Sequence, residues 1–92
     1  MISVQGDKLL RGGQEIGWVS SGEIFDHKGN RVGYFSDDSI YDSSYHKLAY
    51  IEGDTIKGSG QNLYTKDNKK HVSGGNLSDA ARGAVRILFG DS

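Results

Sequence analysis

The chain has 92 residues, contains neither proline nor cysteine, and carries 14 glycines, about twice the share that glycine has in an average protein. This length allows one small domain, and the lack of cysteine excludes a disulfide framework, a thiolate metal site and a cysteine nucleophile. With 11 basic and 12 acidic residues the net charge is −1, which excludes a strongly basic nucleic-acid binder and a highly charged disordered tail.

No apolar run approaches the roughly 20 residues that a membrane-spanning helix needs. The first residues, MISVQGDK, do not have the form of a secretion signal. Together with the absence of cysteine, these features predict a cytoplasmic protein that does not associate with membranes.

A repeat with a period of 16 residues occupies most of the chain. Its clearest marks are three isoleucines: Ile24, Ile40 and Ile56. A second series keeps the same interval: Leu9, Phe25 and Tyr41. The blocks that superpose on this period are 6–21, 22–37 and 38–53. A fourth block starts at Asp54, and we expect its second half at 63–74, after a glycine-rich insertion at 58–62.

Each block has the composition of a β-hairpin. In the second block, a β-branched and aromatic arm (24–26) leads into a polar knuckle (27–30), and a second arm (32–35) returns. Glycine and asparagine in the knuckle can adopt the positive φ that such turns need. Because an isolated hairpin cannot bury its apolar side, neighbouring hairpins must cover one another. Arrangement around a common centre then leaves few free strand edges.

A small residue precedes an aromatic residue in the second arm of each block. The small residues are Gly17, Gly33 and Ala49, and the aromatic residues that follow them are Trp18, Tyr34 and Tyr50. We expect a small side chain where another part of the chain approaches the backbone closely, or where an aromatic ring lies over it.

Two interpretations of these three aromatic side chains are open. Pointing inward, they form the core of a protein that has few other large apolar residues, and aromatic residues at repeat spacing favour this interpretation. Pointing outward, they form a shared face with Tyr45 that is suited to stacking on sugars or on a peptide.

The last part of the chain has the periodicity of an amphipathic helix over 77–89. Ser78 or Asn76 can cap its start, and Gly90 follows as a stop. Such a helix is too short to be stable alone, so it must dock on the β part or on another chain. Gly83 in its middle indicates close packing there. Because apolar residues also lie off the main stripe, we expect a subunit interface formed by Leu77, Ala81, Ala84, Val85, Ile87, Leu88 and Phe89.

The sequence therefore predicts an all-β fold in a single domain, 1–92. A pseudo-four-fold array of short β-hairpins is expected over 3–75, followed by one C-terminal α-helix.

The blocks EIFDHKGNRVGYF and SIYDSSYHKLAYIEGD resemble the repeats of the bacterial four-fold β-flower domain, whose pattern is I-Y-D-x-x-G-x-x-V-G/A-Y-I. The Gly53-Asp54-Thr55-Ile56 segment matches the joint between such repeats. The resemblance covers residues 6–57 closely and 58–74 loosely, and it departs at Tyr45, which stands where the knuckle glycine is expected. It implies four hairpins arranged like petals and an uncharacterised function, and it supplies no catalytic residues to carry over to this chain.

Candidate chemical sites are few. Asp26 and Asp42 occupy one repeat position and are candidates for an acid–base pair, but we interpret them as turn residues that bond to the backbone. The histidines have no metal-ligand spacing and no calcium loop is present, so no metal and no cofactor are expected. The basic cluster Lys66, Lys69 and Lys70 is interpreted as a solvated hairpin tip rather than a nucleic-acid site.

From these observations we expect a non-catalytic structural or protein-interaction module that self-associates through its C-terminal helix, as a homo-oligomer or with a protein partner. The alternative is a module that binds a small ligand, a glycan or a peptide, through the repeat aromatics Trp18, Tyr34, Tyr50 and Tyr45.

Overall fold

The computed structural model describes residues 1–58 and 63–90. In these residues ten strands form one open, mostly antiparallel sheet, with the strand order β10-β1-β2-β3-β4-β5-β6-β7-β8-β9. Only the pairing of β1 with β10 is parallel. The strands are β1 (Ile2–Gln5), β2 (Lys8–Arg11), β3 (Gln14–Ser20), β4 (Glu23–Asp26), β5 (Arg31–Ser36), β6 (Ser39–Asp42), β7 (Lys47–Glu52), β8 (Thr55–Lys57), β9 (Leu63–Tyr64) and β10 (Val72–Ser73).

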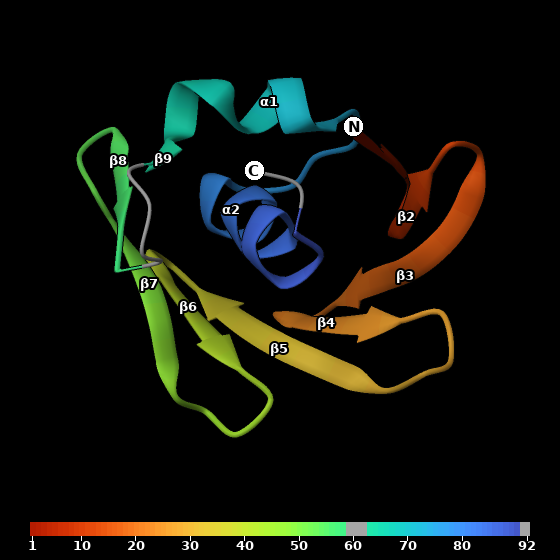
Figure 1. Ribbon diagram of the computed structural model, residues 1–92, viewed down its shortest axis with the longest axis horizontal. Coiled ribbons are helices and arrows are strands. Elements are labelled where there is room, and N and C mark those ends of the chain that lie inside the picture. The colour runs from red at the N-terminus through yellow and green to blue at the C-terminus, as the bar shows by residue number, and fades with distance from the viewer. Residues whose placement is uncertain (59–62, 91–92) are drawn as a thin grey trace.

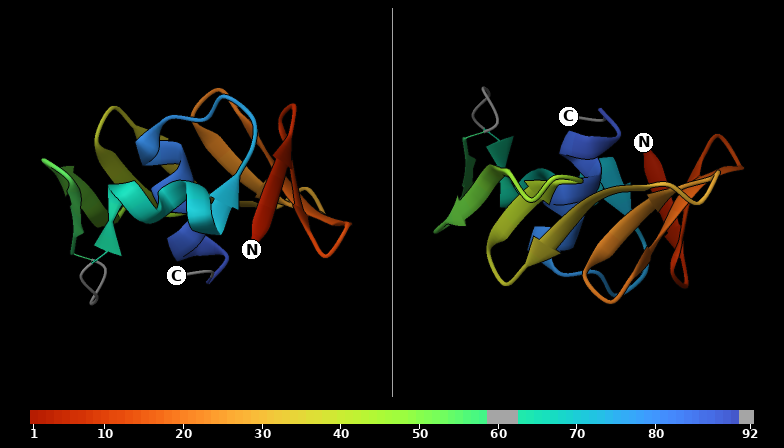
Figure 2. Two further views of the ribbon diagram at one scale, coloured as in Figure 1. Left: turned by 90° about the horizontal axis from the view of Figure 1, so that it is seen from above. Right: turned by 90° about the horizontal axis from the view of Figure 1, so that it is seen from below.

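The sheet curls around the C-terminal helix α2 (Asp79–Leu88), so that hairpins lie on several sides of it (Figure 1). Figure 2 shows α2 crossing the centre of the strand layer from one open side to the other. The two edge strands, β9 and β10, do not pair with each other in the described residues. A 3₁₀ turn, η1 (Thr65–Asp67), and a short helix, α1 (Asn68–His71), span the gap between them.

The same kind of residue pair occurs at each joint between hairpins, where β1 pairs with β2, β3 with β4, β5 with β6 and β7 with β8. In each pair an apolar residue lies opposite an aliphatic one. These pairs are Val4 with Leu9, Val19 with Ile24, Phe35 with Ile40, and Ile51 with Ile56. The second member of each pair is completely buried. The predicted series Leu9, Phe25 and Tyr41 is therefore wrong in its first member, because Leu9 takes the inward position of Ile24.

The reason lies in the first knuckle, which is one residue shorter than the others. Gly12 and Gly13 both have positive φ, +60° and +83°, and they connect Arg11 and Gln14, which pair directly. Two glycines with positive φ form a two-residue turn of the type that matches the twist of antiparallel strands. The shorter turn shifts the first block by one residue relative to the period of 16.

The small residues of the second arms lie where α2 approaches the sheet. A Cβ atom on Gly33 would stand 2.5 Å from Leu88 Cδ1 and 2.6 Å from the carbonyl oxygen of Tyr41. A Cβ atom on Gly17 would meet the carbonyl oxygen of Phe25, and the ring of Phe89 at 3.0 Å. The predicted close approach is confirmed at both glycines.

Helix α2 docks on the β part of its own chain. Ser78 caps its start and accepts a hydrogen bond from the Ala81 amide at 3.2 Å, and Gly90 follows with a φ of +72°. The helix begins two residues later and ends one residue earlier than predicted. Gly83 packs closely as expected, because a Cβ atom there would stand 2.9 Å from Ile56 Cδ1 and 3.4 Å from Ile40 Cδ1.

The seven helix residues predicted as an interface divide into two groups. Ala81, Ala84 and Val85 are buried within the chain and form part of its core. The other four are partly buried and pack against that core: Leu77, Ile87, Leu88 and Phe89. The main apolar stripe of the helix therefore covers the sheet of its own chain.

The predicted second half of a fourth hairpin, 63–74, is instead strand β9, the 3₁₀ turn, α1 and β10. Two arginines of α2, each only 3% exposed, hold this segment. Arg82 donates hydrogen bonds to the carbonyl oxygens of Val72 at 2.7 Å, Gly75 at 3.2 Å and Leu77 at 3.2 Å. Arg86 donates to the Tyr64 carbonyl at 3.1 Å and to Asn68 Oδ1 at 2.9 Å. The predicted insertion at 58–62 lies, apart from Gly58, outside the described residues.

Candidate functional site

The repeat aromatics lie on the outer face of the sheet, the face turned away from α2. Their neighbours Val19, Phe35 and Ile51 pack in or against the core cluster around the helix. Successive side chains of a strand point to opposite faces, so Trp18, Tyr34 and Tyr50 point outward, and none of them belongs to that cluster. The favoured inward interpretation is therefore wrong, because the neighbouring residues already occupy the inner positions. Trp18 is half-buried, Tyr34 is buried with 6% exposed, and Tyr50 is exposed.

Each of the three equivalent aromatics has a different partner. Trp18 stacks on Phe25, directly opposite on β4, with 5.4 Å between ring centroids. The Lys47 ammonium lies 5.3 Å from the centroid of the Tyr50 ring. Tyr34 stacks on Tyr45, from the knuckle between β6 and β7, with centroids 4.0 Å apart and 14° between the ring planes.

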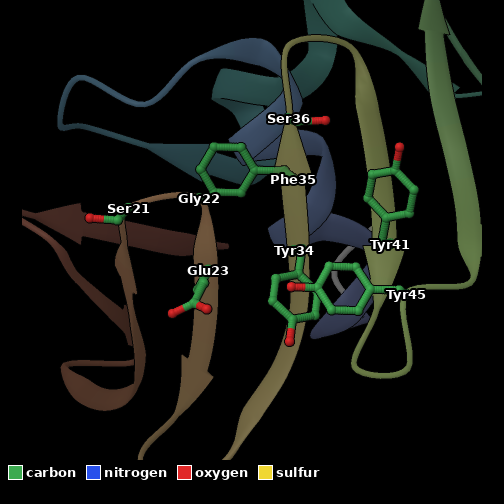
Figure 3. Close-up of a pocket in the computed structure, with 8 residues that line it drawn as sticks. All are labelled: Ser21, Gly22, Glu23, Tyr34, Phe35, Ser36, Tyr41 and Tyr45. Atoms are coloured by element: carbon green, nitrogen blue, oxygen red, sulfur yellow. The ribbon is translucent and has the colours of Figure 1, made fainter.

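An open pocket of about 460 Å³ lies beside the Tyr34–Tyr45 stack, over β4, β5 and β6 (Figure 3). Five lining residues carry hydroxyl groups: Ser21, Ser36, Tyr34, Tyr41 and Tyr45. The other lining residues are Gly22, Glu23 and Phe35. The volume falls within the roughly 300–1,000 Å³ that is usual for small-molecule sites.

Tyr45 has the backbone conformation of a glycine. Its φ is +65°, and the equivalent residue of the preceding hairpin is Gly29, with a φ of +88°. In both knuckles the amide of this residue donates at 3.1 Å to the carbonyl oxygen of the turn aspartate, Asp26 or Asp42. A positive φ costs a residue with a Cβ atom about 1–2 kcal/mol, so Tyr45 is held in a strained conformation.

The only other non-glycine residue with positive φ in the described ranges is Ser21, at +49°, and it lines the same pocket. Such strained residues cluster at functional sites, where the surrounding structure holds them in place.

Tyr34 forms the floor of this site together with an ion pair. The Arg31 guanidinium lies over the Tyr34 ring, 4.8 Å from its centroid, and Arg31 Nη1 donates to Glu23 Oε1 at 2.9 Å. The Tyr34 hydroxyl is buried and has no hydrogen-bond partner among the described residues. Burial, and then the neighbouring Tyr45, raise the pKa of the Tyr34 phenol.

Asp26 and Asp42 are turn residues, as predicted. Asp26 Oδ1 accepts hydrogen bonds from the amides of Lys28 and Asn30, and Asp42 Oδ1 accepts from those of Ser44 and His46, all at 2.9 Å. These bonds stabilise the carboxylates, and they lower the pKa of both groups below 3.8. The two carboxylates are thus engaged in equivalent turns.

The remaining sequence candidates form no common site. In the described part of the chain, no three His, Asp or Glu residues come together to hold a metal ion. The lysine cluster lies on η1 and α1 instead of a hairpin tip, with Lys66 Nζ 5.6 Å from the centroid of the Tyr64 ring and Lys70 paired with Asp67 at 3.4 Å. None of the helices in residues 1–58 and 63–90 is long and apolar enough to span a membrane.

Sequence reasoning identified Tyr34 and Tyr45 but missed Glu23, Tyr41 and the two serines of the pocket. The available signal was Tyr45 itself, the aromatic residue at a knuckle position that otherwise favours glycine.

A comparison of the chain with protein-family models, curated proteins and solved structures finds no match.

Proposed function

We propose that this protein is a non-catalytic interaction module that binds its partner in the pocket beside Tyr34 and Tyr45. The observation that carries the proposal is the coincidence of backbone strain with this pocket. Both strained non-glycine residues of the described chain, Ser21 and Tyr45, line it.

The structural role of position 45 does not require a tyrosine. Gly29 closes the equivalent knuckle with the same backbone hydrogen bond and without the cost of a Cβ atom. Tyr45 instead places an aromatic ring at this position, in a residue that is 67% exposed. An exposed aromatic ring that is held by a strained backbone beside a concave surface is well suited to binding.

The non-catalytic part of the proposal is supported by the hydrogen bonds and the protonation of the two candidate acid–base carboxylates, Asp26 and Asp42. Asp26 and Asp42 each use one oxygen to accept two backbone hydrogen bonds within their own turn. Their lowered pKa values favour the ionised form, and a general acid needs the opposite shift.

We also propose that the hairpins form a pseudo-four-fold array of the β-flower kind. Support comes from the joint pairing that occurs four times with the same register, from Val4–Leu9 to Ile51–Ile56. In this proposal the segment 63–75 takes the place of the last hairpin arm.

The test is an NMR titration of the full chain, following backbone amides. The probes are proline-rich, basic and acidic peptides, and neutral oligosaccharides. We expect at least one of these classes to cause saturable shifts at 21–23, 34–36 and 45, and Tyr45→Gly to remove them. If no class moves these amides, or if the shifts are equal in the variant, the proposal is wrong.

Self-association through α2 is a second proposal, now confined to the partly exposed end of the helix. It is supported by Ile87, Leu88 and Phe89, which are only half-buried in the chain. Sedimentation at micromolar concentration should show a dimer or larger species that Ile87→Gln weakens. A monomer at all concentrations would exclude this route.

A further inference from the structure

We propose that the ligand of this pocket is a neutral, hydroxyl-rich ring, a pyranose unit of a glycan. This inference rests on the proposed function and adds the chemical class of the ligand. It follows from the charges, the hydroxyl groups and the aromatic surfaces that line the pocket.

The charges of the lining disfavour an anionic ligand. Among the eight lining residues Glu23 is the only ionisable carboxyl group, and none is a lysine, arginine or histidine. The nearest cation, Arg31, is already paired with Glu23 at 2.9 Å, so a phosphate or carboxylate in the pocket would find no free cation in the lining to bind it.

A cationic ligand is disfavoured because the two groups of the site that could attract it, the Glu23 carboxylate and the Tyr34 ring, already interact with Arg31. Glu23 Oε1 accepts a hydrogen bond from Arg31 at 2.9 Å, and the same guanidinium lies 4.8 Å from the centroid of the Tyr34 ring. An incoming ammonium group would have to compete with Arg31 for both the carboxylate and the ring. A neutral ligand avoids this competition.

The hydroxyl groups suit a ligand that both donates and accepts hydrogen bonds. Five of the eight lining residues carry a hydroxyl. The Tyr34 hydroxyl is buried, and each of the other four can donate one bond and accept two. Glu23 retains acceptor capacity beside its bond to Arg31, because an ionised carboxylate has about four lone-pair sites. A polyhydroxylated ring can use this mixture of partners, whereas an apolar ligand would leave it unpaired.

The exposed ring of Tyr45 supplies the apolar surface that such a ligand needs. One face of this ring lies against Tyr34, and the residue is still 67% exposed. An aromatic face is electron-rich and attracts the slightly positive C–H groups of a sugar ring that lies parallel to it. In Figure 3, the Tyr41 ring lies beside Tyr45, and both residues line the pocket.

The experiment titrates the full chain with cello-, malto-, chito- and manno-oligosaccharides, and separately with proline-rich, basic and acidic peptides, while amide shifts are recorded. The variants are Tyr45→Gly, which adopts the glycine of the preceding knuckle, and Tyr41→Phe, which removes one hydroxyl group. Tyr64→Ala is the matched control, because Tyr64 is an exposed tyrosine outside the pocket.

We expect at least one neutral oligosaccharide to shift the amides of 21–23, 34–36 and 45 saturably. The affinity should fall at least tenfold in Tyr45→Gly and severalfold in Tyr41→Phe, and stay unchanged in Tyr64→Ala. If only a peptide binds at these amides, the proposed function stands and the glycan inference is overturned. If neither class shifts these amides, or if saccharides bind equally well to Tyr45→Gly, the glycan inference is overturned, and the absence of any binding overturns the proposed function as well.

Discussion

The ring of Tyr45 lies parallel to the ring of Tyr34, 4.0 Å between centroids, although Tyr45 occupies a turn position at which the preceding hairpin has Gly29. The stack joins a knuckle to the outer face of the sheet, and it covers an aromatic ring that would otherwise be open to solvent. Two successive hairpins thus carry the same turn, one with a bare backbone and one with an aromatic surface.

At position 45, glycine should be better tolerated than alanine. Tyr45→Ala loses the aromatic stack, worth about 0.5–1.5 kcal/mol, and retains the strain of a positive φ. Tyr45→Gly loses the stack but relieves the strain, so its free energy of unfolding should exceed that of Tyr45→Ala by about 1 kcal/mol. Urea unfolding measures both variants. Equal stabilities of Tyr45→Ala and Tyr45→Gly would show that residue 45 does not have a positive φ in solution. The matched control is Gly29→Ala, whose free energy of unfolding should fall by about 1 kcal/mol.

Gly33→Ala should destabilise the fold by about 1–3 kcal/mol. The new methyl group would collide with Leu88 Cδ1 and with the carbonyl oxygen of Tyr41, and the backbone atom cannot move aside as a side chain can. The equivalent residue of the next hairpin is already an alanine, Ala49, which is buried. Ala49→Gly should therefore be the milder change, and a Gly33→Ala variant as stable as the parent would contradict the close contact with α2.

Arg82→Met should lower the free energy of unfolding by at least about 2 kcal/mol. The substitution preserves much of the side-chain volume but leaves three buried or part-buried carbonyl groups without their donors, and each unsatisfied buried group costs about 1–3 kcal/mol. Thermal unfolding of Arg82→Met and of Arg11→Met provides the comparison, since Arg11 is exposed and donates its hydrogen bond to the Phe89 carbonyl oxygen at 3.0 Å at the surface. Similar losses in both would mean that the bonds of Arg82 contribute little.

Stability should decrease as the pH falls below the ordinary aspartate pKa of 3.8. Asp26 and Asp42 have lowered pKa values in the folded state, mainly through backbone hydrogen bonds from Asn30 and His46. A lowered folded-state pKa contributes stability above the unfolded-state pKa, and this contribution is lost as the pH falls through the folded-state value. The urea midpoint, measured between pH 7 and pH 2, should depend less on pH in the double variant Asp26→Asn, Asp42→Asn, which can keep the turn without ionising. An unchanged acid dependence in that variant would assign the effect to other carboxylates.

Local chemistry was sufficient to predict much of the architecture from the residues alone. The recurring isoleucines and the knuckle residues indicated hairpins because alternation and turn propensity act within a few neighbours. The turn role of Asp26 and the capping role of Ser78 were likewise readable, since each depends on amides two to four residues away.

Features that join distant segments were decided only by the folded chain. The periodicity of α2 showed an apolar stripe but not which surface it covers, and the curl of the sheet turned that stripe inward. The same curl placed Trp18, Tyr34 and Tyr50 outside, because the inner positions were taken by the neighbouring residues Val19, Phe35 and Ile51 and by the helix.

The pocket and the anchoring arginines have the same origin. Glu23 and Tyr45 come from different hairpins and line one pocket only because β4, β5 and β6 pair in register. From the sequence, Arg86 is indistinguishable from any basic residue in the last turn of a helix. In the structure it is buried and donates a hydrogen bond to the carbonyl oxygen of Tyr64, 22 residues earlier in the chain. Residue spacing specifies the strands, turns and helix, whereas which of their side chains meet depends on how the sheet bends around the helix.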